Sequence, residues 1–229
     1  MPNTVLFVLT SHNQKGNTGQ ATGFYLPEAA HPWAVLTAAG FNVTFTSPQG
    51  GKPPIDGLAT AEHDTICQRF LADASVQNQL ANTPLPQSLN AADYAGIFYV
   101  GGHGTMWDFP DNLALAQLAS AIDANGGIIA AVCHGPAGLV NVKNARGDYL
   151  VAGKRLAAFT DEEEHAVGLA NVVPFLLAST LQARGAIHVP AANWAENVVV
   201  DGRLITGQNP ASATGVAQAM VAALRAESV

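Results

Sequence analysis

Residues 128–139 read Ile-Ile-Ala-Ala-Val-Cys-His-Gly-Pro-Ala-Gly-Leu, and this stretch decides the expected fold. The apolar run 128–132 lies between a pair of glycines and a Gly-Pro pair, which is typical of a buried strand in a parallel sheet. Cys133 then stands at the carboxyl end of the strand, where small residues allow a sharp turn into a helix. The pattern predicts a nucleophile elbow, in which the helix N-terminus favours a thiolate and binds an oxyanion. A buried structural cysteine is the alternative.

Strand-like and helix-like segments alternate outward from this stretch. We expect strands over residues 4–10, 41–47, 97–100 and 128–132, helices over 28–39, 113–125, 171–184 and 210–226, and a hairpin of 198–200 with 204–206. This alternation predicts one α/β domain over residues 1–229. Its sheet would be doubly wound and mostly parallel, with helices on both faces, as in flavodoxin-like folds. The polar segment at about 56–86 has helical tendency, and an inserted flap is one interpretation of it.

Bulk properties exclude several classes of function. The chain has 229 residues, 48% of them hydrophobic, and a net charge of −7 with ten scattered Lys and Arg, so we expect no binding to nucleic acid or to anionic membranes. No apolar run is long enough to span a bilayer. The mean hydropathy of +0.17 suggests apolar surface that a homodimer would bury. The start lacks signal-peptide features, which predicts a cytoplasmic protein, and Cys67 is expected to be an ordinary helix residue.

The residues near Cys133 suit covalent chemistry. His134 follows it directly, so its N–H can point into an oxyanion site while its imidazole pairs with the thiol. Gly101 and Gly102 follow another predicted strand and can supply a second N–H, because glycine permits close backbone approach. The next residue, His103, is the other histidine most expected to touch the pocket. A simple tight turn is the alternative for these glycines.

Carboxylates complete the candidate chemistry. Glu28 stands at a predicted helix start, where an acid is also favoured by the helix dipole. The acidic run 161–164 follows Thr160, a predicted N-cap, and one of these acids could orient His134. Three aromatic residues are candidates either for the pocket wall or for core and interface packing: Trp107, Phe109 and Trp194.

Several segments together resemble the PfpI/ThiJ superfamily over nearly the whole chain. They are 25–32 (Tyr-Leu-Pro-Glu-Ala-Ala-His-Pro), 101–104 (Gly-Gly-His-Gly), 130–137 (Ala-Ala-Val-Cys-His-Gly-Pro-Ala), 159–161 (Phe-Thr-Asp) and 201–212, which ends in Asn-Pro-Ala-Ser. The first and last make the chain most similar to the glutathione-independent glyoxalase (glyoxalase III) and heat-shock chaperone subgroup of the class I glutamine amidotransferase-like proteins.

The resemblance implies roles for particular residues. Cys133 matches the nucleophile, His134 its neighbour and Glu28 the acid that contacts the nucleophile. Glu164 matches the acid that pairs with the histidine, with the neighbouring acids as alternatives. The family also implies that the N–H groups of Gly102 and His134 form the oxyanion hole. We find no His-Glu metal cluster like that of some subgroup members, so we expect no metal and no cofactor.

The implied activity is that of a glyoxalase III-type lyase of the D-lactate dehydratase class, in a stress-response protein. Methylglyoxal or a related 2-oxoaldehyde would become a 2-hydroxy acid such as lactate, without glutathione, through a hemithioacetal on Cys133. For this chemistry we expect a raised pKa for Glu28 and a lowered pKa for Cys133.

Other functions remain open from the sequence. A cysteine elbow with an oxyanion hole equally suits a cysteine-dependent amidase or peptidase, and the superfamily also includes isonitrile hydratases and claimed deglycases. A non-enzymatic stress protein is a different class of function: a chaperone using exposed apolar surface, or a redox sensor in which Cys133 is oxidised.

Overall fold

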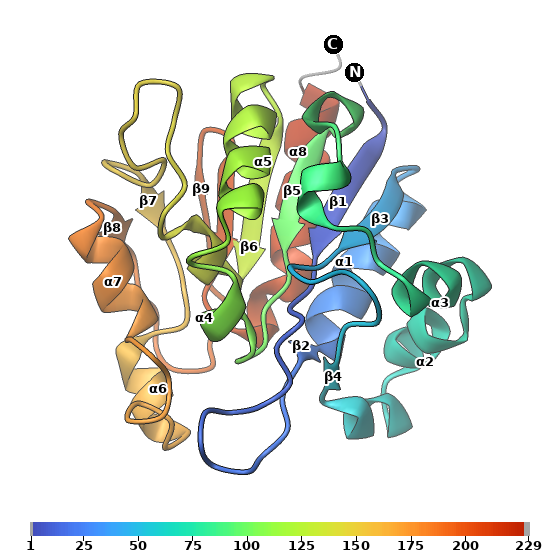
Figure 1. Cartoon of the computed structure of the whole chain (residues 1–229), viewed down its shortest axis with the longest axis horizontal. Helices are drawn as coiled ribbons and strands as arrows, with labels where there is room; N and C mark the ends of the chain where they lie inside the picture. The colour runs from blue at the N-terminus through green and yellow to red at the C-terminus, as the bar shows by residue number, and fades with distance from the viewer. Residues whose placement is uncertain (1, 227–229) are drawn as a thin grey trace.

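The computed structural model describes residues 2–226, and a six-stranded sheet lies at its centre (Figure 1). The strands lie in the order β3 (Asn42–Thr46), β1 (Thr4–Val8), β5 (Gly96–Tyr99), β6 (Ile128–Val132), β10 (Leu204–Gly207) and β9 (Val198–Asp201). Neighbouring strands are parallel except β9 and β10, which form the expected antiparallel hairpin. The predicted mostly parallel α/β sheet is confirmed.

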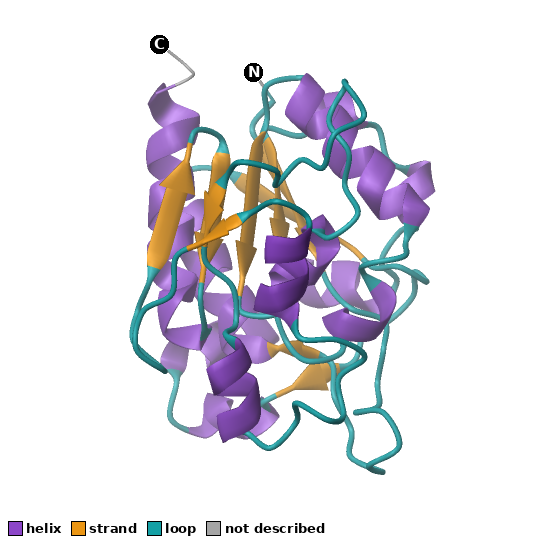
Figure 2. Cartoon of the chain, turned by 90° about the vertical axis from the view of Figure 1, so that its left-hand side faces the viewer, coloured by secondary structure: helices purple, strands orange, loops and turns teal. Residues whose placement is uncertain are grey.

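Helices cover both faces of the sheet (Figures 1 and 2). Helices α1 (Leu26–Ala38) and α8 (Ala213–Ala226) pack against each other and the sheet, and α5 (Leu113–Ala124) packs on β5 and β6. Every residue of β6 is buried, as expected for a strand covered on both faces. Among the helices that the structure describes, none is long and apolar enough to cross a bilayer.

The connections place a switch point beside β1. The chain passes from β1 to β3 on one side and then returns to β5 on the other side of β1. In open α/β sheets of this kind, ligands bind beyond the carboxyl ends of the strands next to such a point. The turn at residues 101–104 follows β5, and Cys133 follows β6, so both lie at that edge.

The segment at 56–86 is an excursion beside the edge strand β3. It starts at the short pair β2 (Phe24–Tyr25) with β4 (Ile55–Asp56) and continues through η1 (Leu58–Glu62), α2 (Thr65–Ala72) and α3 (Ala74–Ala81), followed by η2 (Pro86–Ser88) and η3 (Ala91–Asp93). Helix α2 packs on α1 and buries Cys67 and Phe70. The predicted helical tendency is confirmed, and Cys67 is a helix residue.

Two predicted helices begin later than expected. Residues 171–176 form turns, and α7 covers only Leu177–Ala183, because Pro174 lacks an N–H and disfavours the helical conformation of the residue before it. At the C-terminal end, η5 (Pro210–Ser212) is a 3₁₀ turn that precedes α8. The remaining elements are α4 (Thr105–Asp108), η4 (Gly135–Leu139), β7 (Arg155–Leu156), α6 (Asp161–Ala166) and β8 (Ile187–His188), of which β7 and β8 pair in parallel.

Candidate active site

Cys133 occupies a strained turn between β6 and η4. Its φ is +60°, a left-handed conformation that non-glycine residues rarely adopt. Its N–H donates to the Gly207 carbonyl over 3.0 Å, and its own carbonyl accepts from the Phe159 N–H over 2.9 Å, so the backbone is held on both sides. A Cβ on Gly135 would lie 2.2 Å from the Tyr99 carbonyl oxygen, which explains the small residue after the elbow. The turn continues as a short 3₁₀ helix and not as the expected longer helix.

The thiol lies at the floor of a cavity of about 230 Å³ at the carboxyl ends of β5 and β6. Most of the predicted site residues line this cavity, together with residues that precede α1, follow α6 or lie in long loops. The complete lining consists of Lys15, Tyr25, Glu28, Asp56, Gly102, His103, Cys133, His134, Phe159, Val167, Trp194 and Pro210. Glu164 and Gly101 lie behind this wall and contact His134 and Glu28 respectively.

His134 connects the thiol to a carboxylate. Its Nδ1 lies 3.4 Å from Cys133 Sγ, and its Nε2 lies 2.7 Å from Glu164 Oε2. Burial and the neighbouring His103 lower the pKa of His134 to about 4, so the imidazole is neutral at neutral pH. Burial alone would raise the pKa of Glu164, but hydrogen bonds with His103 and His134 lower it to about 2. The ionised Glu164 therefore accepts from Nε2–H, which leaves the Nδ1 lone pair facing the thiol.

The second oxygen of Glu164 is also used. His103 Nε2 lies 2.8 Å from Glu164 Oε1, and the two imidazole rings are 4.1 Å apart between centroids. One carboxylate thus orients both histidines.

The other acids of the run have different partners. Glu163 forms a capping box with Thr160, and it also accepts from the Trp194 N–H, Gln208 and Asn209. Asp161 bonds the Ser179 hydroxyl, and Glu162 is exposed. Only Glu164 in this run reaches His134, which favours that assignment over its neighbours.

Glu28 lies on the other side of the thiol. It is fully buried, and neither carboxyl oxygen has a hydrogen-bond partner of standard geometry among residues 2–226. Burial raises the pKa of Glu28 from 4.5 to about 8, although the nearby Cys133 thiol and Gly101 N–H act to lower it. The raised pKa was expected. A neutral, protonated Glu28 therefore predominates at neutral pH.

The expected lowering of the Cys133 pKa is wrong for this arrangement. Burial and the charge of Glu28 raise the pKa of the thiol well above its ordinary value, and the nearby His134 N–H offsets this only in part. The sequence placed the thiol at a helix N-terminus, but η4 is a single short 3₁₀ turn with little dipole. The thiol therefore needs a base to take its proton when it reacts.

Two backbone N–H groups lie beside the thiol. Across the described part of the chain, no backbone carbonyl accepts from the N–H of Gly102 or of His134. Gly102 has φ +111°, and a Cβ there would meet the Gly23 carbonyl oxygen at 2.3 Å, so only glycine fits. Gly101 has another position: a Cβ on it would lie 2.1 Å from Glu28 Oε2. We propose that Gly102 and His134 supply the oxyanion donors, while Gly101 makes room for Glu28.

A residue that sequence reasoning missed links these two donors. The buried Thr105 hydroxyl lies 2.9 Å from the Gly102 carbonyl and 3.0 Å from the His134 carbonyl. It follows the Gly-rich turn by only one residue, but nothing in the pattern marks its partner 29 residues away.

We expect Thr105→Val to lower kcat about tenfold, because loss of a buried hydrogen bond worth about 1 kcal/mol lets the donors separate. The measurement is steady-state kinetics on the substrate proposed below. Thr46→Val is the matched control, since Thr46 lies on the edge strand β3, is equally buried and donates its hydroxyl hydrogen bond to the Pro84 carbonyl. Equal rates for both variants would show that Thr105 has no role in positioning.

The buried carboxyl of Glu28 also makes the free energy of unfolding depend on pH. Between pH 4.5 and about 8, the folded protein retains a proton on Glu28 that the unfolded chain releases, so rising pH favours unfolding across this window. Glu28→Gln has no such loss. The variant should therefore gain stability relative to the wild type as pH rises through the window, by a few kcal/mol in all. Thermal unfolding across this range measures the difference, and a difference that does not change with pH would contradict the buried, protonated carboxyl.

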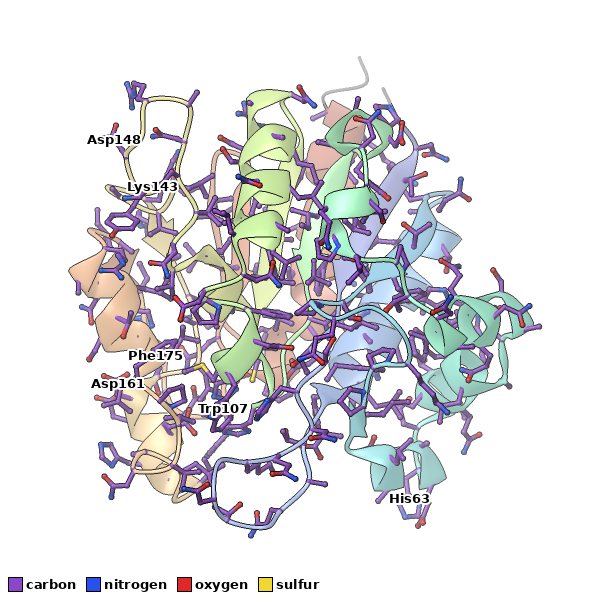
Figure 3. All side chains as sticks on the ribbon, viewed as in Figure 1. His63, Trp107, Lys143, Asp148, Asp161 and Phe175 are labelled. Atoms are coloured by element: carbon purple, nitrogen blue, oxygen red, sulfur yellow. The ribbon has the colours of Figure 1, made fainter. Side chains whose placement is uncertain are left out.

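The aromatic candidates divide into one wall residue and two packing residues. Trp194 lines the cavity with φ +65° and packs near Phe159. Trp107 stacks on His12 with ring centroids 5.0 Å apart, beside the long loop near the N-terminus (Figure 3). Phe109 is buried against Tyr99. Neither Trp107 nor Phe109 lines the cavity, so for these two the packing alternative holds.

Two groups of side chains in residues 2–226 could hold a metal ion, although spacing in the sequence revealed neither. They are His103, His134 and Glu164 in the cavity, and His31, Asp64 and Cys67 between α1 and α2. The three members of the cavity group come from distant segments, and His31 lies 33 residues before Asp64, so neither complete group forms a ligand motif in the sequence.

The family model for the DJ-1/PfpI family matches residues 20–168, which include Glu28, Cys133 and Glu164. The chain belongs to the DJ-1/PfpI family. Over 98% of its length it is 35% identical to the glutathione-independent glyoxalase HSP31 of Saccharomyces cerevisiae, 99% of which is covered. This DJ-1/PfpI protein also resembles solved structures of similar length.

The rapid encystment protein REP24 of Francisella tularensis matches with a TM-score of 0.93 and 39% identity, over 98% of this chain and 99% of that one. Glyoxalase III of Candida albicans matches with a TM-score of 0.88 and 29% identity, over 96% of each chain. The resemblance to the glyoxalase III subgroup that the sequence motifs indicated is confirmed.

Proposed function

We propose that this protein is a glutathione-independent glyoxalase that converts methylglyoxal or a related 2-oxoaldehyde to the 2-hydroxy acid. The observation that carries the proposal is the placement of Cys133 between two bases, Glu28 and His134, at the floor of a small cavity. The similarity of the chain to curated glyoxalases over nearly its full length supports the same activity.

The first step forms a carbon–sulfur bond. Glu28 has a pKa of about 8 and is the strongest base next to Sγ, so its ionised form takes the thiol proton as sulfur attacks the aldehyde carbon. The aldehyde oxygen becomes negative and is held by the N–H groups of Gly102 and His134. Each such donor is typically worth about 2.7–4 kcal/mol in the transition state. The oxygen then takes a proton from Glu28, which gives the hemithioacetal.

The second step moves hydrogen between the two carbons. The unprotonated Nδ1 of His134 removes the proton from the thiohemiacetal carbon, while the ionised Glu28 takes the proton of the neighbouring hydroxyl and passes it to the ketone oxygen, which gives an enediolate. The imidazolium of His134 then returns its proton to the second carbon, and the negative oxygen on the first carbon becomes the carbonyl of a thioester of the 2-hydroxy acid. Water then cleaves the carbon–sulfur bond, which releases the acid and restores the thiol. Glu164 holds the correct tautomer of His134 throughout, and the atoms balance with water as the only added reactant.

The cavity argues for a small substrate. A volume of about 230 Å³ accommodates a three-carbon oxoaldehyde but not a folded polypeptide. The Cys133–His134–Glu164 series would also suit hydrolysis of small amides, since it repeats the thiol, imidazole and carboxylate order of acyl-transfer enzymes. Glu28 has no part in that reaction, so its buried position favours the oxoaldehyde.

The deciding experiment is lactate production from methylglyoxal by purified protein in the absence of glutathione. Lactate from the wild type establishes the activity. If no lactate forms and a small amide is hydrolysed instead, the amidase takes the place of this proposal.

Two further predictions concern the setting of the enzyme. We propose that it acts as a homodimer, on the basis of its hydropathy and of exposed apolar side chains such as Leu113 and Ile187. Sedimentation of the purified protein tests this. We also propose a cytoplasmic location, where methylglyoxal would be encountered, and cell fractionation tests it.

A further inference from the structure

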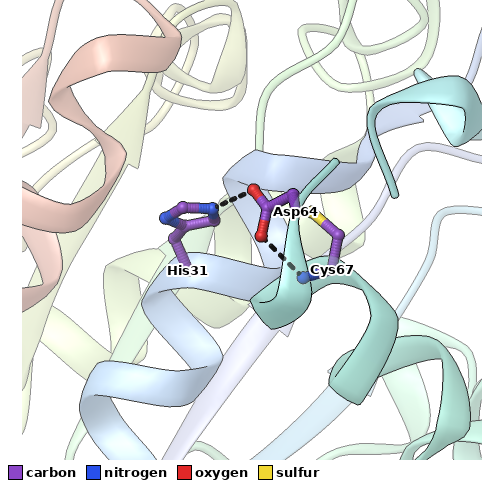
Figure 4. A group of neighbouring side chains, drawn as sticks. All are labelled: His31, Asp64 and Cys67. Carbon is purple, nitrogen blue, oxygen red and sulfur yellow. Dashed lines mark hydrogen bonds and ion pairs between the residues drawn. The ribbon is translucent and has the colours of Figure 1, made fainter. Parts of the chain in front are cut away.

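His31, Asp64 and Cys67 form a cluster between α1 and α2, and none of the three lines the cavity (Figure 4). His31 lies on α1, Asp64 is the N-cap of α2, and Cys67 lies in the first turn of α2. Each offers one ligand atom, and these three atoms all lie within 4.8 Å of one another. From this convergence we propose that His31, Asp64 and Cys67 bind one zinc ion.

The donor set fits zinc. Zinc accepts thiolate, imidazole and carboxylate ligands in tetrahedral sites, at about 2.3 Å for sulfur and about 2.0–2.2 Å for nitrogen and oxygen. Ligand atoms in such a site lie about 3.3–3.6 Å apart. The pair His31 Nε2 and Asp64 Oδ2 is now 2.6 Å apart, so a small rotation of each side chain opens the space. One thiolate and one carboxylate balance the two positive charges of the ion.

The surroundings orient two of the ligands. Asp64 Oδ1 accepts the N–H groups of Ile66 and Cys67 at 2.9 and 3.0 Å, which fixes the carboxylate so that Oδ2 faces His31. His31 Nδ1 lies 3.3 Å from the Thr214 hydroxyl on α8. When Nε2 binds the ion, Nδ1 carries the proton, and this N–H donates a hydrogen bond to the Thr214 hydroxyl. Metal-bound histidines commonly have an outer contact of this kind.

The cluster is sealed on one side and open on the other. Cys67 is fully buried, whereas the side chains of His31 and Asp64 are 28% and 25% exposed. An ion can therefore enter from the side of His31 and Asp64, and water takes the fourth position. On binding, a zinc–sulfur bond forms and the thiol proton passes to water. The ion would tie α2 and the excursion at 56–86 to α1, the helix that carries Glu28.

Cobalt(II) is the probe for this site, because a cobalt–thiolate bond has a charge-transfer absorption in the near ultraviolet. The chain has two cysteines, so in the Cys133→Ala protein Cys67 is the one remaining thiol. We expect this protein to bind one equivalent of cobalt with a thiolate band, and zinc to displace it. Cys67→Ser in the same background should abolish the band.

Two milder variants keep the test independent of folding. His31→Gln should weaken zinc binding at least tenfold, and Thr214→Val should weaken it about tenfold, measured by competition with a chromophoric chelator. His63→Gln is the matched control, since His63 is exposed at the tip of the excursion, next to the cluster but outside it (Figure 3). Its zinc affinity should equal that of the parent.

The opposite results are equally clear. Absence of a thiolate band in the Cys133→Ala protein would overturn the proposal, and so would equal affinity in the His31→Gln variant. If zinc binding is lost only in the His103→Gln variant, the ion belongs to the cavity, and this result also overturns the proposal. These measurements do not use lactate formation, so they stand or fall separately from the proposed glyoxalase activity.

Discussion

Replacing Cys133 with alanine should lower the conversion of methylglyoxal to lactate by at least about a thousandfold. No other group in the cavity can form the hemithioacetal, and removing a covalent nucleophile typically removes most of the rate. The fold should persist, since the change removes one sulfur atom beside an existing cavity. Lactate measured with an enzymatic assay gives the rate, and circular dichroism confirms that the variant is folded.

The same variant separates the enzyme from a non-enzymatic stress protein. Suppression of aggregation of a heated client protein uses exposed apolar surface, so a chaperone function should survive Cys133→Ala unchanged. If the variant formed lactate at the wild-type rate, this result would contradict the covalent mechanism. Loss of both activities in a folded variant would show that Cys133 serves the chaperone function as well.

Glu28→Gln should lower kcat by about a hundredfold or more, because glutamine has the shape of the protonated acid but cannot accept the thiol proton. In the wild type, kcat/KM should rise about tenfold per pH unit up to about pH 8 and then level off, as the carboxyl of pKa about 8 ionises. This rise should be absent from the glutamine variant. The pKa of His134, about 4, is too low to contribute to the profile in this range.

Glu28→Asp is the informative companion to that variant. It retains an ionisable carboxyl on a shorter side chain, so part of the activity and the rise with pH should remain. An unchanged pH profile in the glutamine variant would mean that another group takes the thiol proton. A glutamine variant as active as the wild type would exclude Glu28 from the chemistry.

The parts of the fold that were predictable are those whose signals are local. Strand β6 ends at Val132 as expected, because an apolar run stops at a cysteine followed by glycine and proline. The capping box of α6 is likewise local, since Thr160 and Glu163 are only three residues apart. Local patterns of this kind were enough to place Cys133 at the carboxyl edge of a parallel sheet.

What could not be predicted depends on contacts between distant segments. The choice of Glu164 over Glu163 follows from which side of α6 faces His134, and three consecutive glutamates carry no such information. The raised pKa of the Cys133 thiol depends on its burial and on a carboxyl 105 residues earlier in the chain. The zinc ligand set similarly joins His31 to residues 33 and 36 positions later.

The partners of Glu163 bear on the order in which the molecule assembles. This buried carboxylate accepts donors from the Trp194 backbone and from Gln208 and Asn209, which lie 31, 45 and 46 residues further along the chain. An unpaired buried charge is costly, so α6 cannot dock stably until the loop with Trp194 and the end of β10 arrive. Such long-range closure is slow compared with local structure. We therefore expect the cavity wall to be the last part to fold, and on heating the first to open, while the parallel sheet beneath it stays intact.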